Sequence, residues 1–348
     1  MDDWRNCIKA LQFPKIGAAQ VIDVPVPKVS GNQVLIKVGA AGVCYSDIMA
    51  FKGLHPYRVP PVITGHEAAG EVVSTGDLVK RVKIGDRVAV EPHAGCGACW
   101  HCRHGQYNLC ADKRLIGVGS WMGAFSEFMV AEEDMCFQIP SSISDEEGAT
   151  IEPFAVGFHA VRVSGMNIGQ TAAILGCGTI GMMTLLSSRI GGAVNVLVSE
   201  PSAEKRRMAQ ALGADRTINP LETDPVAAAF DMSGGKGIDT VFVTVSGTQV
   251  LKQALLMCRR GGTVVVVAVF PGETPVELWQ IQNYERKMIG TNMYTADDYI
   301  AAIELYKAGK VDLKPLITNR VPIEESPAAI RALADGERPD DIKTVFLF

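Results

Sequence analysis

The sequence predicts an α/β protein of two domains, one compact and β-rich and the other built on a doubly wound parallel sheet. Three observations support this fold class. The chain has 348 residues, more than one ordinary hydrophobic core accommodates. Short β-type runs broken by glycine and proline dominate roughly the first 150 residues. After Thr171, strand-like and helix-like runs alternate.

In the β-rich part, we expect strands at residues 33–38, 69–73 and 87–90. The alternating part begins with a strand at 172–175, followed by a glycine-rich turn and an apolar-periodic helix that reaches about Ile190. Further strands are expected at 195–199, 240–245 and 263–269, and helices at 203–212 and 249–259. Continuous apolar strands of this kind are typical of a parallel sheet buried on both faces, and right-handed crossovers make it doubly wound.

The alternation ends near Gly290, and the tail carries a helix candidate at 296–307 and an apolar strand at 344–348. We interpret this tail as returning to complete the first domain. The expected domains are therefore residues 1–155 with 292–348, which form the β-rich domain, and residues 156–291, which form the doubly wound domain.

Composition excludes several classes of function. The net charge of −5 argues against a nucleic-acid partner, which favours a basic face. The longest apolar run, residues 264–270, is far shorter than the roughly 20 residues of a membrane helix. The first ten residues carry acids where a signal peptide carries bases. We expect a cytoplasmic protein that binds neither nucleic acid nor membrane.

A nucleotide-binding turn is predicted at residues 176–181, where GCGTIG fits G-x-G-x-x-G between a strand and a helix. The glycines permit a tight turn and close approach to a pyrophosphate, which meets the free amides of the helix. Glu200 ends the next strand, where its carboxylate accepts a ribose diol and repels a 2′-phosphate. NAD is therefore expected rather than NADP, although Lys205 and Arg206 keep NADP open. The candidate cofactor-binding residues are Gly176, Gly178, Ile180, Gly181, Glu200 and Lys205.

Four of the nine cysteines lie within fifteen residues, with the spacing C-x2-C-x2-C-x7-C. In a reducing compartment, such clustering favours metal over disulfides. Four thiolates complete the closed tetrahedral shell of a structural zinc, and an iron–sulfur cluster is the alternative. These candidate ligands are Cys96, Cys99, Cys102 and Cys110.

A second, open metal site is predicted from Cys44 in GVCYSD, His66 and Glu67 in TGHE, and Glu152 in IEPF. Thiolate, imidazole and carboxylate all ligate zinc, and a catalytic site leaves one position for water or substrate. Each signal alone is weak, because a lone cysteine is usually a buried apolar residue.

The order of these motifs resembles the zinc-containing medium-chain dehydrogenase/reductase family along nearly the whole chain, and most of all its sorbitol, threonine and galactitol-phosphate dehydrogenase branch. The resemblance implies a GroES-like catalytic domain interrupted by a Rossmann domain, with the active site in the cleft between them. It also implies that Cys44 and His66 bind a catalytic zinc, while Glu67 and Glu152 supply or exchange the remaining contact. With the four-cysteine site, this gives two zinc ions per subunit.

The activity implied by this resemblance is that of a zinc-dependent alcohol or polyol dehydrogenase. Such an oxidoreductase transfers a hydride between a secondary alcohol, diol or polyol and NAD to give a ketone. Ser46 matches the family position whose hydroxyl contacts the substrate oxygen and begins proton release. The family also implies a homodimer or homotetramer, with residues 263–269 or 287–293 as the edge strand in contact.

Three departures from the family pattern bear on the substrate. Residues 48–50 lack the expected proton-relay histidine, for which His55 or ordered water could substitute. Met293 stands where sorbitol dehydrogenases carry arginine, and Tyr45 replaces a glycine; both favour a less polar substrate. The alternatives are a non-catalytic dinucleotide-binding sensor and a dehydrogenase of amino alcohols or aldehyde adducts. A zinc-free reductase on the same scaffold would need none of these metal ligands.

Overall fold

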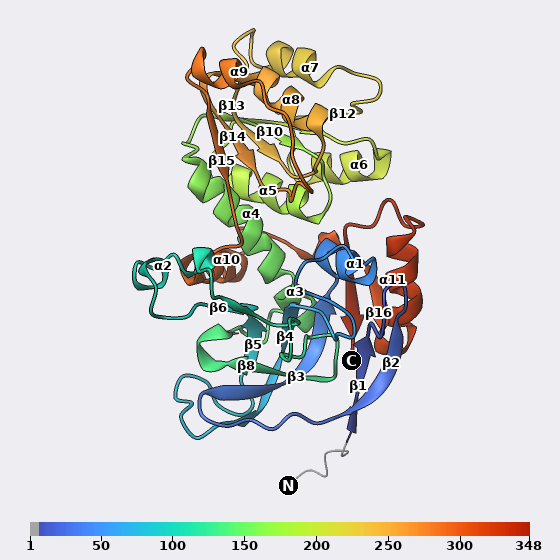
Figure 1. The fold of residues 1–348 in the computed structure, drawn as a ribbon. Coiled ribbons are helices and arrows are strands. Elements are labelled where there is room, and N and C mark those ends of the chain that lie inside the picture. Colours follow the sequence, from blue (N-terminus) through green and yellow to red (C-terminus); the bar gives the residue numbers. More distant parts are fainter. Residues whose placement is uncertain (1–6) are drawn as a thin grey trace. The chain divides into compact units, whose positions relative to one another are not determined.

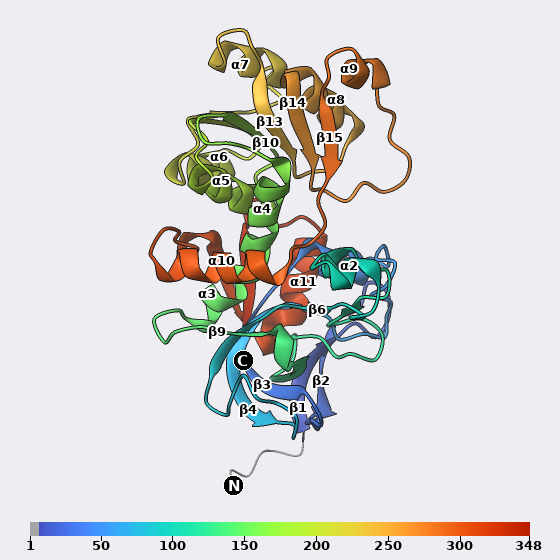
Figure 2. The same ribbon diagram turned by 90° about the vertical axis from the view of Figure 1, so that its left-hand side faces the viewer.

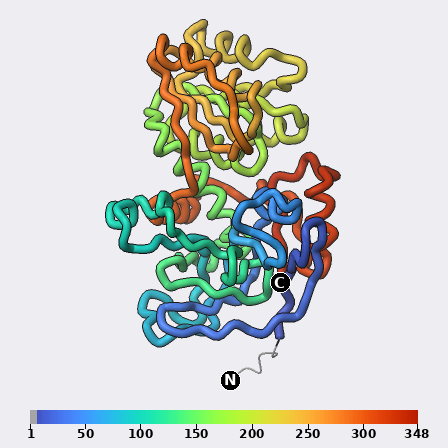
Figure 3. The backbone as a smooth tube through the Cα atoms, viewed as in Figure 1, coloured from blue at the N-terminus to red at the C-terminus, as the bar shows by residue number. Residues whose placement is uncertain are grey.

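The computed structural model describes residues 7–348, which form two compact units (Figure 1). The first unit comprises the chain up to Glu152 together with Thr295–Phe348, and the second comprises Pro153–Tyr294. The expected boundaries, after residue 155 and before residue 292, lie a few residues away. Figure 3 follows the chain out of the first unit and back into it for the C-terminal segment.

The first unit contains a seven-stranded sheet to which both ends of the chain contribute. Its strand order is β16-β17-β3-β4-β5-β9, and β8 also pairs with β3. The C-terminal strand pairs antiparallel with β3, with Val345 opposite Gly42, and the tail thus belongs to this unit. The strands are β3 (Gln33–Gly42), β4 (Glu67–Thr75), β5 (Arg87–Val90), β8 (Phe128–Glu132), β9 (Cys136–Gln138), β16 (Ile317–Pro322) and β17 (Lys343–Leu347).

Two small hairpin-like sheets and several helices complete the first unit (Figure 2). In β3, Val34, Ile36 and Val38 alternate into a core that also receives Phe125 and Phe346. The small sheets are β1 (Cys7–Gln12) with β2 (Gln20–Pro25), and β6 (His93–Ala94) with β7 (Arg114–Leu115). The α-helices are α1 (Tyr45–Phe51), α2 (Trp100–Arg103), α3 (Asp145–Ala149), α10 (Ala296–Lys307) and α11 (Ser326–Ala334), and a short 3₁₀ turn, η1, spans Tyr107–Leu109.

The second unit is built on a six-stranded parallel sheet, in the order β12-β11-β10-β13-β14-β15. This order is typical of dinucleotide-binding folds and confirms the predicted fold class. Val241, Val243 and Val264 are fully buried, as expected for strands covered on both faces. The strands are β10 (Thr171–Leu175), β11 (Asn195–Ser199), β12 (Arg216–Ile218), β13 (Ile238–Val243), β14 (Cys258–Val266) and β15 (Lys287–Gly290). The helices are α4 (Ile151–Ser164), α5 (Thr179–Ile190), α6 (Ala203–Ala211), α7 (Pro225–Met232), α8 (Thr248–Met257) and α9 (Leu278–Gln282).

The sequence suggested residues 263–269 or 287–293 as an edge strand of this sheet, and the structure contradicts the first of these. Strand β14 pairs with β13 on one side and β15 on the other. Residues 263–269 therefore do not form an edge strand, and that prediction is wrong. Among the described strands, β15 and β12 lie at the two ends of the sheet. Of the two segments predicted from the sequence, only the one at residues 287–293 presents an unpaired strand edge.

Membrane insertion by a helix finds no support in residues 7–348, because none of the helices there combines the length and the apolar character needed to span a bilayer.

Candidate functional site

Three of the four predicted ligands of the open metal site lie together in the first unit. Cys44 precedes helix α1, His66 precedes strand β4, and Glu67 is the first residue of that strand. One ligand atom from each lies within 4.8 Å of the others. The pairing of β3 with β4 places Gly42 opposite Glu67, which explains how these two segments meet. A thiolate, an imidazole and a carboxylate at this separation fit a single zinc ion with an open position.

Glu152, the fourth predicted ligand, does not belong to this three-residue cluster in the described structure. It is buried near the start of α4, within electrostatic reach of Glu91 and Tyr299. Burial raises the pKa of Glu91 to about 8, the negative charges of Glu152 and Asp298 add to this increase, and a hydrogen bond from Tyr107 opposes it. The Tyr107 hydroxyl donates to Glu91 Oε1 at 2.6 Å. Glu152 thus lies in a buried, acid-rich part of the unit.

Lys343 holds the Glu67 carboxylate in place. Its Nζ donates to both carboxylate oxygens of Glu67, at 2.9 and 2.6 Å, and to the carbonyl of Val43 at 3.0 Å. Both side chains are almost fully buried, with exposed fractions of 1% for the lysine and 2% for the glutamate. The two residues are 276 positions apart in the chain, and sequence reasoning did not single out the lysine.

Asp47 links the metal-binding loop to His66. Its carboxylate accepts hydrogen bonds from the Cys44 amide at 3.0 Å, the Thr64 hydroxyl at 2.5 Å and the Gly65 amide at 3.2 Å. Burial raises the pKa of Asp47, but His66, Arg58 and Thr64 together hold it well below its usual range. Nδ1 of His66 lies 3.7 Å from Asp47 Oδ1, which leaves Nε2 as the ring nitrogen available to a metal.

Ser46, the predicted substrate-contacting hydroxyl, is bonded to a buried arginine. Nη1 of Arg58 donates to Ser46 Oγ at 3.0 Å. His55 lies beside the same nitrogen, with its Nε2 3.4 Å from Nη1. No motif pointed to Arg58, because the residue lies in a loop between the CYSD and GHE segments.

His55 does not serve as a proton acceptor for Ser46. Its Nδ1 accepts the backbone amides of Tyr57 at 3.1 Å and Arg58 at 3.0 Å, so the neutral ring carries its proton on Nε2. Burial and the Arg58 charge lower the pKa of His55 to about 4. Of the two substitutes expected for the missing relay histidine, this geometry disfavours His55.

The four-cysteine motif forms a compact cluster in a lobe of the first unit. One sulfur from each of the four cysteines lies within 4.8 Å of the others. The Cys96 and Cys102 sulfurs are 3.9 Å apart. Two thiolates on a tetrahedral zinc, with Zn–S bonds of about 2.3 Å, lie about 3.8 Å apart. The Ala98 and Cys99 amides lower the pKa of Cys96 to about 6, as suits a metal-binding thiolate.

A close approach at Gly95 shows how tightly this lobe is built. A Cβ atom at this position would lie 2.6 Å from the Cys102 sulfur. His101 and His104, which lie in the same loop, are outside the cluster, and His104 stacks on Trp100 with ring centroids 4.1 Å apart. The donor set therefore consists of four sulfurs, which fits a structural zinc.

In the second unit, the glycine-rich turn follows β10 and opens α5, as the motif requires. Gly176 has a φ of +90°, which favours glycine, and a Cβ on Gly181 would lie 2.2 Å from the Gly176 carbonyl oxygen. The Thr244 hydroxyl donates to the carbonyls of Leu175 and Gly176 at 2.9 and 2.7 Å. Thr244 was not predicted as a site residue, because it directly follows the neighbouring strand β13 and is distant from this turn in the sequence. Gly178 caps α5, and Ile180 lies in its first turn.

Glu200 follows β11 and lies beside the glycine-rich turn. Its carboxylate accepts the Cys177 amide at 2.8 Å and the Ser202 amide at 3.0 Å, and lone pairs remain for a further donor. Arg206 donates to the carbonyls of Glu200 and Pro201 at 2.8 and 2.6 Å. Lys205, also in the first part of α6, lies within electrostatic reach of Cys177.

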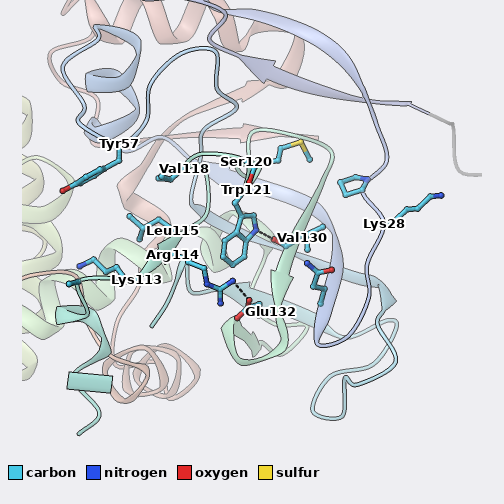
Figure 4. A pocket seen from close by; sticks show the side chains of 14 residues that line it. Lys28, Tyr57, Lys113, Arg114, Leu115, Val118, Ser120, Trp121, Val130 and Glu132 are labelled. Carbon is cyan, nitrogen blue, oxygen red and sulfur yellow. Dashed lines mark hydrogen bonds and ion pairs between the residues drawn. The ribbon is translucent and has the colours of Figure 1, made fainter. Parts of the chain in front are cut away.

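A cavity of about 690 Å³ in the first unit contains none of the predicted site residues (Figure 4). Several polar side chains of its lining are already paired. Arg114 forms a 2.6 Å ion pair with Glu132 and lies over the ring of Trp121, whose Nε1 donates to the Val130 carbonyl at 2.8 Å. We therefore assign no catalytic role to this cavity.

Comparison with known proteins identifies the source of these features. The model of the alcohol dehydrogenase GroES-like domain matches residues 30–141, and that of the zinc-binding dehydrogenase matches residues 179–308. The chain is 36% identical over 331 residues to sorbitol dehydrogenase of Bacillus subtilis, covering 94% of both proteins. It is 34% identical over 308 residues to L-threonine 3-dehydrogenase of Pyrococcus horikoshii, covering 87% of this chain and 88% of the relative.

Solved structures agree with these relatives. Galactitol-1-phosphate dehydrogenase from Escherichia coli superposes with a TM-score of 0.91 at 26% identity, over 98% of this chain and 100% of its own. A zinc-binding dehydrogenase structure from Sinorhizobium meliloti, bound to NADP, gives a TM-score of 0.92 at 31% identity, over 99% and 100% of the two chains. The fold and the branch predicted from the sequence are confirmed, and the NADP in this neighbour leaves the choice of cofactor to the argument below.

Proposed function

Because the chain belongs to the zinc-containing medium-chain dehydrogenase/reductase family, we propose that it oxidises a secondary alcohol, diol or polyol to a ketone with NAD as hydride acceptor. Membership of this family makes the protein a zinc-type oxidoreductase; the substrate and the preference for NAD are the proposal. The observation that carries it is the cluster of Cys44, His66 and Glu67 within 4.8 Å, in a chain that also holds a nucleotide-binding turn.

We assign the catalytic metal to Cys44, His66 and Glu67, with Asp47 orienting the histidine and Lys343 orienting the glutamate. Glu152 is an exchange ligand at most, because it lies outside the cluster. The second zinc belongs to the four-cysteine lobe. When bound at the open site, zinc supplies Lewis acidity that lowers the pKa of the substrate hydroxyl.

Ser46 has a defined direction of hydrogen bonding in this site. Because the Arg58 guanidinium only donates, Ser46 Oγ accepts its bond, and the Ser46 proton points to another acceptor. We assign that acceptor to the substrate oxygen. A proton released by the substrate then leaves through water, since neither Arg58 nor neutral His55 accepts it.

Ser46→Ala is expected to lower kcat by about 100-fold, the scale of one lost hydrogen-bond donor to the reacting oxygen, with the zinc content unchanged. Ser120→Ala, at an exposed serine outside the site, serves as the matched control. Steady-state kinetics and metal analysis on both variants check the result. A rate equal to that of the wild type in Ser46→Ala would remove the serine from the mechanism.

The preference for NAD rests on the charge of Glu200. Glu200→Gln is expected to raise the NADP-to-NAD ratio of kcat/KM by at least about tenfold, because a charged hydrogen-bond acceptor for the ribose and a repulsive charge are both lost. Glutamine keeps the size and shape of the side chain, but its single oxygen accepts only one of the two amides, from Cys177 or Ser202, that the Glu200 carboxylate accepts. The control is Glu204→Gln in the first turn of α6. An unchanged ratio would show that Glu200 does not select the cofactor.

The proposed function itself is tested by turnover. Purified protein is mixed with NAD or NADP and a panel of polyols, secondary alcohols, diols, amino alcohols and thiol–aldehyde adducts, and reduced nicotinamide is followed before and after chelation. Turnover of hydroxyl compounds that disappears with the metal is the expected result. Preference for an amino alcohol or an aldehyde adduct would shift the substrate class. Binding of NAD without turnover, despite bound zinc, would favour a sensor.

A further inference from the structure

We propose that Arg58 binds an anionic group of the substrate, a carboxylate or a phosphate, close to the hydroxyl that is oxidised. This inference rests on the proposed function and narrows its substrate class from neutral polyols to hydroxy acids or polyol phosphates. It is carried by the surroundings of the Arg58 side chain.

The Arg58 guanidinium is buried without a counter-ion. The residue is 6% exposed, and its Nε has no hydrogen-bond partner. Within residues 7–348, no carboxylate oxygen lies within 4.0 Å of its nitrogens, and Nη1 is the only one with polar neighbours, the Ser46 hydroxyl at 3.0 Å and Nε2 of His55 at 3.4 Å. Buried charges in proteins are normally paired, because an unpaired one loses its hydration without replacement. The missing partner is then supplied by a ligand.

The neighbouring carboxylates are already engaged. Asp47 acts on Arg58 through space, but its oxygens accept hydrogen bonds from three other donors, the amides of Cys44 and Gly65 and the hydroxyl of Thr64. Both oxygens of Glu67 are held by Lys343. Neither side chain therefore provides the direct partner that the Arg58 fork lacks.

Arg58 also lies where a substrate group would reach it. It is one hydrogen bond from Ser46, which is two residues from Cys44, and its charge acts on His66. The planar guanidinium presents several donors in a fork that matches two oxygens of a carboxylate or phosphate. With one nitrogen on Ser46, the other donors remain for an anionic group near the reacting carbon.

This placement changes the expectation drawn from the sequence. The absence of an arginine before Tyr294 suggested a less polar substrate. Arg58 introduces a positive donor from a different loop, and this donor is part of the unit that contains Cys44, Ser46 and His66. We therefore expect the site to favour charged over neutral hydroxyl compounds.

The test uses the zinc-loaded protein and two matched sets of substrates. One set is glycerol, glycerate and glycerol phosphate; the other is sorbitol, gluconate and sorbitol 6-phosphate. In the wild type, an anionic member of at least one set is expected to exceed its neutral counterpart by about tenfold or more in kcat/KM, the scale of one charged hydrogen bond. Comparing the carboxylate and phosphate members identifies which anion is bound.

Two variants separate charge from geometry. Arg58→Gln is expected to remove the anionic-to-neutral preference, and Arg58→Lys to retain only part of it because the fork is lost. The compared quantity is the ratio of kcat/KM for the anionic substrate to kcat/KM for its neutral counterpart. A disturbance of Ser46 affects the oxidation of both substrates, so it cancels in this ratio. Arg81→Gln, at an exposed arginine that pairs with Asp134 and with none of the site residues, is the control and keeps the ratio of the wild type.

A binding measurement accompanies the kinetics. The preferred anionic compound is expected to raise the melting temperature of the wild type but not that of Arg58→Gln, since a ligand stabilises only a fold that binds it. The melting curves without ligand show whether each variant is folded.

The outcomes distinguish this inference from the proposed function. Metal-dependent turnover with an equal or greater rate on neutral members overturns the inference and leaves the function standing. A rise in the KM for NAD in Arg58→Gln, with the substrate ratio unchanged, assigns the arginine to the cofactor and also overturns it. Absence of turnover and of any melting shift with every compound overturns both.

Discussion

Cys44→Ala is expected to remove one of two bound zinc ions per chain and to lower turnover by about 1,000-fold or more. The thiolate is one of three ligand atoms within 4.8 Å, and the remaining two, from His66 and Glu67, do not hold the ion against buffer. A zinc ion bound at this position lowers the activation free energy by several kcal/mol, which corresponds to roughly three powers of ten in rate. Metal analysis and steady-state kinetics measure the two losses together.

Cys7→Ala is the matched control, because Cys7 is an exposed cysteine in β1 that belongs to neither cluster. It is expected to keep both ions and full activity. The four-cysteine lobe stays intact in Cys44→Ala. The melting temperature of this variant is therefore expected to be close to that of wild-type protein whose open site holds no metal. Retention of both zinc ions in Cys44→Ala would contradict the assignment of the open site.

The ligands of this site could be predicted from the sequence because each lies in a short motif. Cys44 stands in C-Y-S-D and His66 in G-H-E, and the order of these motifs along the chain, which resembles that of the family, identified them. The residues that hold these ligands in place could not be predicted in the same way. Lys343 reaches Glu67 from the last strand, and only the pairing of β17 with β3 brings the two together. A buried ion pair formed over such a separation leaves no local pattern.

Arg58 and Thr244 illustrate two other limits of the sequence. Arg58 lies in an irregular loop, where an arginine is usually exposed, and only the structure shows that it is buried and bonded to Ser46. Thr244 follows a strand that was expected to continue to residue 245 but ends at Val243. Its hydroxyl then closes the glycine-rich turn from the neighbouring strand. Strand ends depend on such tertiary contacts, whereas strand interiors follow from their apolar runs.

Strand order shows the same contrast. The apolar runs identified β13 and β14 as strands of a parallel sheet, because burial on both faces imposes that composition. The order of strands across the sheet depends on crossovers, which composition does not encode. Placing residues 263–269 at the edge was therefore an error, and the sheet pairing places β15 there instead.

Cys102→Ala is expected to have the opposite pattern to Cys44→Ala, with a large loss of stability and retained ligands at the open site. The lobe has little regular structure, with helix α2 of four residues and a three-residue turn at Tyr107–Leu109. Its cysteines therefore depend on the metal for their mutual position, and structural zinc contributes directly to folding free energy. We expect the melting temperature to fall by about 10 °C, the scale of a few kcal/mol in a chain of this size.

The stability loss in Cys102→Ala should also reach beyond the lobe, because Tyr107 between the third and fourth cysteines is hydrogen-bonded to Glu91. Limited proteolysis is expected to cut first between Cys96 and Cys110, while NAD binding, measured by titration, stays close to that of the wild type. The two cysteine variants serve as reciprocal controls, since each should lose one ion of a different kind. A Cys102→Ala protein with unchanged melting and two zinc ions would show that the four cysteines do not form a structural metal site, whatever the open site does.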